Sequence, residues 1–252
     1  MRCLAIICTL LTLTLAMLVS TAAGQNCCGV QCHCCTCAGG PPCASPIIVD
    51  TTGQGFQLTS AEDGVIFDIS GTGSPIPIAW TAPSSGNAFL ALDRNHDGKI
   101  DSGKELFGNF TSQPPCPDGG RTCLNGYRAL AEFDRPENGG NGDGIIDSRD
   151  AVFSHLRLWI DQNHDGMSQP NELHTLPELG VYSISLHYRD DAHFFDEYGN
   201  WFHYQSALNP DPQDGKSKDG RVTYDVYFMR LNEGGQTARP LPVPGLGPSP
   251  AQ

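Results

Sequence analysis

Two short acidic segments share the pattern Asp-x-Asn-His-Asp-Gly, at residues 93–98 and 161–166. Side-chain oxygens at the first, third and fifth places of such a segment can converge on a hard cation, and glycine at the sixth place permits a sharp turn. A single copy is equally typical of a solvated Asx turn. Because each copy directly follows an apolar run, 88–92 and 156–160, the repetition favours cation binding.

Calcium needs about six to eight oxygens at about 2.3–2.6 Å, including a main-chain carbonyl at the seventh place and a carboxylate at the twelfth. The segment 161–172, called here the third loop, supplies a residue at every place: Asp161, Asn163, Asp165, Met167 (carbonyl), Gln169 and Glu172. The segment 93–105, the first loop, supplies Asp93, Asn95, Asp97, Lys99 (carbonyl), Asp101 and Glu105. Its twelfth place is Lys104, so either Glu105 closes the site one residue late or Asp101 binds directly.

A less regular segment, 134–150, is called the second loop. It offers Asn141, Asp143, Ile145 (carbonyl), Asp147 and Asp150 in the same order. Its first place falls on Gly139, so the first ligand is expected from an insertion, either Asp134 or Glu137. Residues 67–73 form a degenerate further copy with too few carboxylates for a site.

The charge of the chain agrees with cation binding. There are 28 acidic residues against 15 Lys and Arg, a net charge of −13, and twelve of the acids lie in the three loops. An acidic chain without a basic stripe argues against nucleic acid or an anionic membrane as partner. We therefore expect calcium ions as cofactor and partner, with no nucleic acid and no membrane insertion.

Residues 1–24 have the features of a secretory signal peptide, with a basic start, an apolar run and small residues before the cleavage site. The expected location is therefore secreted, either extracellular or periplasmic. In an oxidising compartment Cys116 and Cys123 are predicted to form a disulfide. Residues 25–45 hold seven further cysteines, which either form disulfides or bind soft metal ions.

The elements that must position the loops lie in residues 46–232, the only candidate domain. The Pro/Gly-rich residues 233–252 are expected to be extended or disordered. Apolar patterns predict strands, and acids at first-turn positions predict short helices after the loops, near 150–153 and 171–174. Strands are expected at 89–92, 156–160, 181–186, 201–204 and 222–228, and a further helix at 126–133. The expected fold is α+β, with small antiparallel sheets and short helices joined by strand-loop-helix calcium loops.

These motifs carry a family resemblance. The first and third loops resemble EF-hand-type calcium loops. The run from Ala88 to Asn109, and the order of the later loops as far as 180, are similar to segments of secreted bacterial proteins with hemolysin-type (RTX-associated) calcium repeats. The resemblance covers about 46–232 and implies calcium binding and export, but no reaction. The hemolysin nonapeptide array itself is absent, apart from one imperfect copy at 139–144.

Motifs for catalysis are missing: there is no G-x-S-x-G, H-E-x-x-H or phosphate loop. His96 and His164 occupy the fourth loop place, which points outward, so neither is expected to be a ligand. Aromatic and histidine side chains gather at 187–204, either as a ligand groove or as a hairpin packed on the core. The leading expectation is a non-enzymatic calcium-binding protein. The alternatives are a secreted hydrolase or carbohydrate-binding module with structural calcium, and a soft-metal or redox module built on the Cys-rich segment.

Overall fold

Two strands at the centre of the molecule are buried along their whole length. In the computed structural model, which describes residues 44–191 and 193–231, these are β1 (Ile47–Asp50) and β4 (Asn87–Ala91). Successive side chains of a strand point to opposite faces, so a strand with several consecutive apolar residues must be covered on both sides. The apolar runs 47–49 of β1 and 88–91 of β4 therefore place these strands in the middle of the fold.

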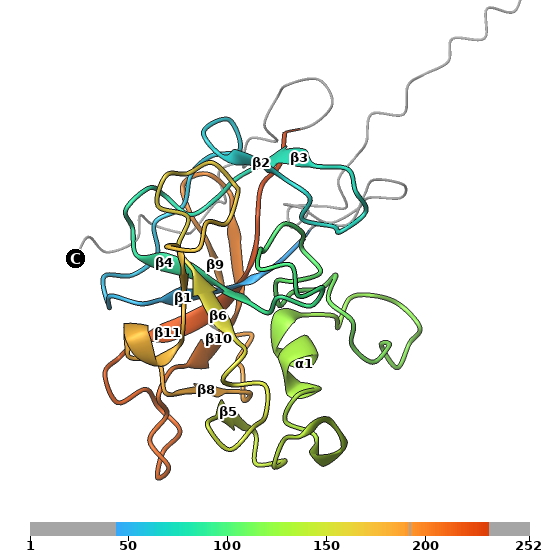
Figure 1. Cartoon of the computed structure of the whole chain (residues 1–252), viewed down its shortest axis with the longest axis vertical. Helices are drawn as coiled ribbons and strands as arrows, with labels where there is room; N and C mark the ends of the chain where they lie inside the picture. Colours follow the sequence, from blue (N-terminus) through green and yellow to red (C-terminus); the bar gives the residue numbers. More distant parts are fainter. Residues whose placement is uncertain (1–43, 192, 232–252) are drawn as a thin grey trace, which may run out of the picture.

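The two central strands belong to a seven-stranded antiparallel sheet with the order β7-β6-β4-β1-β11-β10-β9 (Figure 1). Its other strands are β6 (Arg157–Trp159), β7 (Leu173–His174), β9 (Phe194–Phe195), β10 (Trp201–Ala207) and β11 (Val222–Tyr227). In the register, Phe89 of β4 is opposite Trp159 of β6, and Ile48 of β1 is opposite Tyr224 of β11. Both edge strands are only two residues long.

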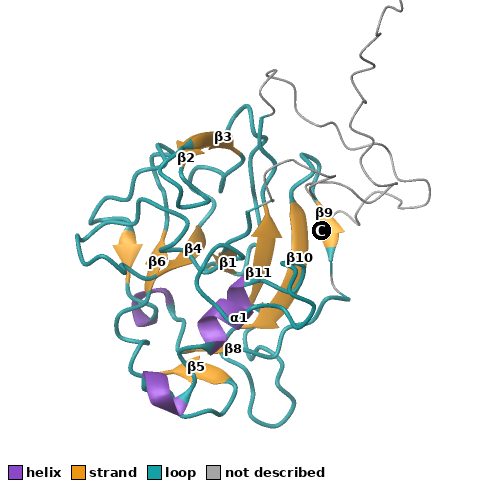
Figure 2. Cartoon of the chain, turned by 90° about the vertical axis from the view of Figure 1, so that its right-hand side faces the viewer, coloured by secondary structure: helices purple, strands orange, loops and turns teal. Residues whose placement is uncertain are grey.

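Each face of the sheet is covered by a separate hydrophobic cluster. One contains Ile48 and Phe89 with Trp80 and the hairpin of β2 (Val65–Phe67) and β3 (Ile76–Ile78). The other contains Ile47 and Leu90 with helix α1 (Gly126–Ala131) and the strand pair β5 (Ile145–Asp147) and β8 (Ser183–Ser185). In Figures 1 and 2 the β2–β3 hairpin and the β5–β8 pair lie on opposite sides of the sheet. The sheet is thus the middle of three layers.

Helix α1 begins where the sequence predicts it. The side chain of Asn125 accepts a hydrogen bond from the N–H of Arg128, as an N-cap residue does. The helix ends at Ala131, two residues earlier than expected. Short 3-10 turns follow at Pro136–Asn138 and Pro177–Leu179.

In the part of the chain that the structure describes, no helix is long and apolar enough to span a membrane.

The predicted α+β class is wrong, because the described chain is mostly β, with 28% strand and 6% helix. The five predicted strands correspond to β4, β6, β8, β10 and β11. The two predicted exit helices do not form: residues after Asp150 make turns, and residues after the third loop enter strand β7. The reason is that the acids at both places fold back into their own loops, as described below, and do not cap a helix.

The predicted disulfide between Cys116 and Cys123 is confirmed, with the two Cα atoms 5.7 Å apart. It closes a short exposed loop that precedes α1. The predicted signal peptide, nearly all of the Cys-rich segment and the Pro/Gly-rich tail lie outside the described residues.

Candidate metal centre: three acidic loops

The third loop connects β6 to β7 and is organised around Asp161. This side chain is buried, and its carboxylate accepts the N–H groups of Asp165 and Gly166 at 3.1 and 2.8 Å. It also accepts the indole N–H of Trp80 at 2.8 Å. Asn163 accepts the N–H of Asp165, and Asp165 accepts the N–H of Met167. The alternation of acceptors thus holds a tight turn in which each acid faces its own backbone.

The end of the third loop folds back on its beginning through Glu172. Its carboxylate accepts the N–H of Gln162 at 3.0 Å and that of Gln169 at 3.2 Å, and it also receives the indole N–H of Trp159. The side chain of Gln169 donates to Asp165. The residues predicted as ligands in this loop are therefore connected in one hydrogen-bond network.

The first loop, which follows β4, repeats this network. Asp93 accepts the N–H groups of His96 and Gly98 at 2.7 and 2.9 Å. Asn95 accepts the N–H of Asp97, and Asp97 accepts that of Lys99. Glu105 accepts the N–H groups of Arg94 and Asp101, the counterparts of Gln162 and Gln169. Glu105, not Lys104, therefore occupies the place that Glu172 has in the third loop, while Asp101 is exposed.

The second loop uses the insertion that its sequence indicates. Asp134 accepts the N–H groups of Gly142 and Gly144 at 3.0 and 2.9 Å. The same alternation follows, because Asn141 accepts from Asp143, and Asp143 from Ile145. Asp150 accepts the N–H groups of Asn141 and Asp147 and closes the loop. Glu137, the other candidate for the first place, forms a salt bridge with Arg135 instead.

The backbone conformation explains why the first and third loops both have glycine at the sixth place. His96 and His164 have φ of 61° and 58°, and the glycines two residues later have φ of 83° and 71°. Such values lie in the left-handed region, which glycine adopts at no steric cost. Two left-handed residues at the same places give the two loops the same path.

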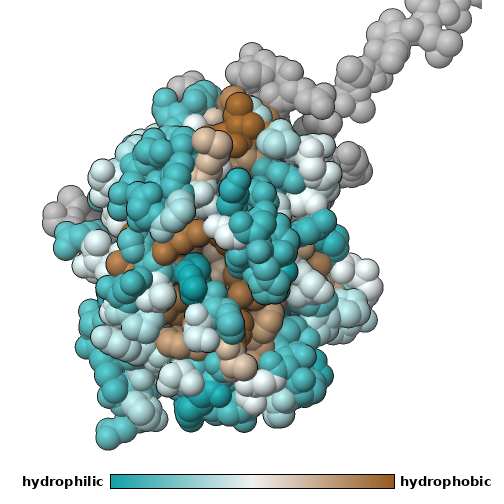
Figure 3. All heavy atoms as spheres, viewed as in Figure 1, coloured by the Kyte–Doolittle hydropathy of each residue, from teal (hydrophilic) through white to brown (hydrophobic). Residues whose placement is uncertain are grey.

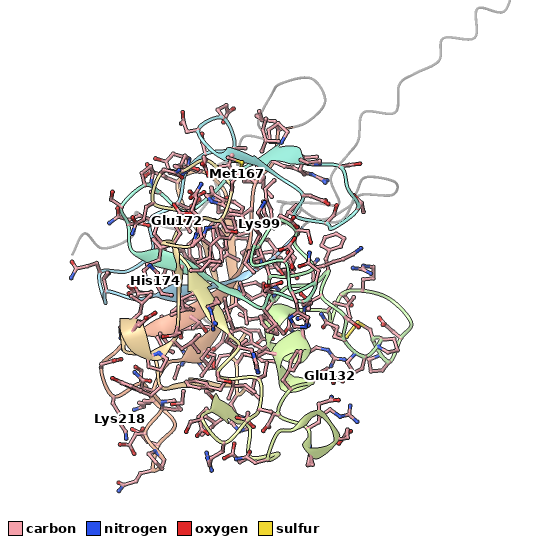
Figure 4. All side chains as sticks on the ribbon, viewed as in Figure 1. Lys99, Glu132, Met167, Glu172, His174 and Lys218 are labelled. Carbon is pink, nitrogen blue, oxygen red and sulfur yellow. A yellow bond between two sulfur atoms is a disulfide. The ribbon has the colours of Figure 1, made fainter. Side chains whose placement is uncertain are left out.

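The first and third loops lie side by side. The N–H of Ile100 donates to the hydroxyl of Ser168 at 2.7 Å. Figure 4 labels Lys99 of the first loop and Met167 and Glu172 of the third. The His164 ring points away from its loop, as expected, and its two nitrogens approach the carbonyls of Thr81 and Asp63 at 3.0 and 2.7 Å. These ties to the segment around β2 and β3 were not predicted, because they join residues more than 80 positions apart.

The loops differ in how their charge is balanced. In the second loop, the guanidinium of Arg149 forms salt bridges with both Asp143 and Asp147. Its hydrogen bond lowers the pKa of Asp147. No side-chain salt bridge reaches the acids of the first or third loop from anywhere in 44–191 or 193–231. The sequence signal for this difference is a single arginine, Arg149, between Asp147 and Asp150.

Two closing acids have raised pKa values. Burial raises the pKa of Glu105, and the neighbouring carboxylates of Asp101 and Asp93 add to this effect against the hydrogen bonds that lower it. Burial likewise raises the pKa of Asp150, with contributions from Asp134 and Asp147. Both loops thus bring negative groups together at a cost that a bound cation would reduce.

Among the described residues, no three His, Cys, Asp or Glu side chains converge closely enough to form a metal site by themselves. The loop carboxylates are instead spread along each turn and held by main-chain N–H groups. An ionised carboxylate has about four acceptor positions, so these hydrogen bonds leave lone pairs free. Chemically, the arrangement offers side-chain and carbonyl oxygens, which suit a hard cation.

The aromatic segment 187–204 packs mainly on itself and on the sheet. The Trp201 ring stacks on those of Phe195 and His203, and the Phe194 ring stacks on that of Phe202. Burial lowers the pKa of His203 to about 4. This geometry gives the histidine a packing role beside the edge of the sheet.

Comparison with known proteins places the chain in a family. Residues 47–228 match the SPM domain. The chain is 41% identical over 147 residues to the iron-regulated protein FrpA of Neisseria meningitidis serogroup C, an alignment that covers 58% of this chain and 12% of that protein. The chain therefore spans only a small part of the length of this relative.

The predicted resemblance to EF-hand-type calcium loops of secreted hemolysin-type proteins is wrong. The family match is to a different domain, and the loops are followed by turns and a short strand, so the structure shows no EF-hand-type calcium loops. Since the SPM match covers more than half of the sequence, the chain belongs to the SPM domain family.

Proposed function

We propose that this SPM domain binds calcium through its first and third loops, and more weakly through its second, and that the ions stabilise the fold. This role requires no catalysis. The observation that carries the proposal is the repeated hydrogen-bond network, in which an Asp, an Asn, a second Asp and a closing acid are held by loop N–H groups in the same order.

The balance of charge supports the proposal. The third loop holds Asp161, Asp165 and Glu172 without a salt bridge to any side chain in the described residues. Because Asp161 and Glu172 are also buried, their charges are poorly solvated. A divalent cation would offset this cost, and a flexible set of oxygens suits calcium better than magnesium, which requires near-octahedral geometry.

We also propose that the chain is exported. Sites of extracellular modules bind calcium with Kd of about 10⁻⁴–10⁻³ M, and a secreted protein meets calcium in this range. The apolar run near the start of the sequence and the Cys116–Cys123 disulfide support this location.

Asp165→Ala tests the third loop. Calcium at tenfold excess over Kd stabilises a protein by about 1.4 kcal/mol per site. The variant should lose about this share of the calcium-dependent stabilisation and change little in chelator, because Asp165 is exposed. Thermal unfolding with calcium and with chelator measures both quantities. Lys104→Ala is the matched control and should keep the full gain. If Asp165→Ala gains as much melting temperature from calcium as the wild type, the third loop is only a turn.

Arg149→Gln tests the second loop. The guanidinium of Arg149 lies between Asp143 and Asp147, where it competes with a metal ion for the same carboxylates. Its removal should raise the calcium affinity of this loop by up to about tenfold, because the ion no longer displaces a guanidinium from the two carboxylates. Isothermal titration calorimetry should then resolve one more ion per chain than in the wild type at equal calcium. An unchanged stoichiometry and affinity would argue against a metal site in the second loop.

A further inference from the structure

A cavity of about 620 Å³ lies between the first loop, the end of the second loop and the edge of the sheet. Its walls come from four separate parts of the chain, including β6 and β7. A neighbouring cavity of about 410 Å³ shares Arg94, Phe133 and Asn138 with it. In the face shown in Figure 3, hydrophobic side chains are visible at the hollowed centre, surrounded by hydrophilic ones.

The wall of the larger cavity carries more basic than acidic side chains, in contrast to the chain as a whole. It carries Arg94, Arg157, His96 and His155, whereas its only acid is Asp93. The carboxylate of Asp93 already accepts two loop N–H groups. In a chain with a net charge of −13, this concentration of basic groups around one cavity marks a local site for an anion.

Arg94 is fixed in place and forms no salt bridge with any described residue, although the carboxylate of Glu105 attracts its guanidinium at longer range. Its guanidinium lies 5.1 Å from the ring centre of Phe107 and 5.4 Å from that of Phe133. Its Nε donates to the carbonyl of Lys104, while its Nη2 is buried and has no hydrogen-bond partner in the structure. Buried donors are normally satisfied, so an unsatisfied guanidinium nitrogen at a cavity wall indicates a missing acceptor.

Arg157 approaches the cavity from β6. Its Nη1 donates to the carbonyls of Ser154 and Leu156, which orient the guanidinium. Neither Arg157 nor Arg94 forms a salt bridge with any acid among the described residues. Two oriented guanidinium groups match the planar geometry of a carboxylate or the oxygens of a phosphate.

The remaining wall is apolar. Leu92, Ile100, Phe133, Val152 and Leu173 line the cavity beside the basic groups. A volume of this size is typical of sites for small molecules, which combine an apolar lining with a few polar groups that fix orientation. We propose that this cavity binds a small organic anion, in which a carboxylate or phosphate is attached to an apolar body.

The test uses benzoate and phenyl phosphate as probes, with benzamide as the neutral isostere of benzoate. Each is titrated into the ¹⁵N-labelled chain in chelator, and benzoate also in calcium. Chemical-shift changes should be confined to amides around the cavity, and benzoate or phenyl phosphate should bind at least tenfold more tightly than benzamide. Equal binding of benzoate and benzamide, or shifts scattered over the surface, would overturn the proposal.

Substitutions identify the groups that select the anion. Arg157→Gln should weaken binding of the better anionic probe about tenfold, the effect of losing one charge-assisted hydrogen bond. His155→Gln, at an exposed position, should give a smaller loss without affecting folding. Arg189→Gln is the matched control, because this arginine is exposed near β9 and β10, away from the cavity. If Arg157→Gln and Arg189→Gln bind the probe equally well, the cavity does not recognise anions. The measurement in chelator makes this result independent of calcium binding.

Discussion

Replacing Asp161 by alanine should lower the free energy of unfolding by about 3–5 kcal/mol even in chelator. The carboxylate is buried and accepts the indole N–H of Trp80 and the main-chain N–H groups of Asp165 and Gly166. Its removal leaves the indole N–H of Trp80 and the N–H of Gly166 without a partner, whereas the N–H of Asp165 keeps Asn163 as acceptor. Each buried unsatisfied donor costs about 1–3 kcal/mol. Denaturant unfolding followed by tryptophan fluorescence measures the loss.

Asp165→Ala provides the control for this variant, because it removes an acid from the same loop at an exposed position. Its cost in chelator should stay below about 1 kcal/mol, as for most surface substitutions. If both variants lose the same stability, Asp161 has no structural role beyond that of any loop acid.

Asp225 should make the stability of the protein depend on pH. This carboxyl group lies in β11 with no exposed surface, and burial raises its pKa to about 6, against the lowering effect of the nearby Ser45 side chain and of the N–H of Gly126, which donates to it. The unfolded chain has an Asp pKa of about 3.9. Because the pKa in the folded state is the higher one, the contribution to stability is complete below about pH 4 and decreases as the pH rises toward and past 6. The gap between the folded and unfolded pKa values corresponds to about 3 kcal/mol.

Comparison with Asp225→Asn isolates this effect from the other acids. The difference in unfolding free energy, wild type minus variant, should fall by about 2 kcal/mol between about pH 4 and pH 7. Denaturant titrations in chelator at a series of pH values give this difference directly. A difference that stays constant across the range would mean that Asp225 ionises equally in the folded and unfolded chain.

The local parts of the fold could be predicted from the sequence. The apolar runs before the first and third loops give β4 and β6, and the alternating residues near 201 and 222 give β10 and β11. Spacing alone left Glu105 and Asp101 as alternatives at the end of the first loop, and in the structure Glu105 accepts the N–H groups of Arg94 and Asp101. These features depend on contacts within about a dozen residues.

The two predicted exit helices are wrong because the same local sequence pattern is compatible with two structures. An acid near the end of a loop can cap a helix or turn back to accept loop N–H groups, and Asp150 and Glu172 do the latter. The order of the strands in the sheet depends on contacts between distant segments, such as β1 with β11. It therefore cannot be predicted from the sequence pattern of any one segment. The cavity could not be predicted for the same reason, because Arg94 and Arg157 line the same cavity only after β4 pairs with β6.

The two-residue strands at the edges of the sheet affect the tendency of the protein to aggregate. Exposed edges carry unpaired N–H and carbonyl groups on which another chain can add a strand, the first step of ordered aggregation. Here β7 and β9 offer so few main-chain groups that an incoming strand would gain little. The central strands, which are apolar on both faces and would be hazardous if exposed, are thereby kept from acting as templates at high protein concentration.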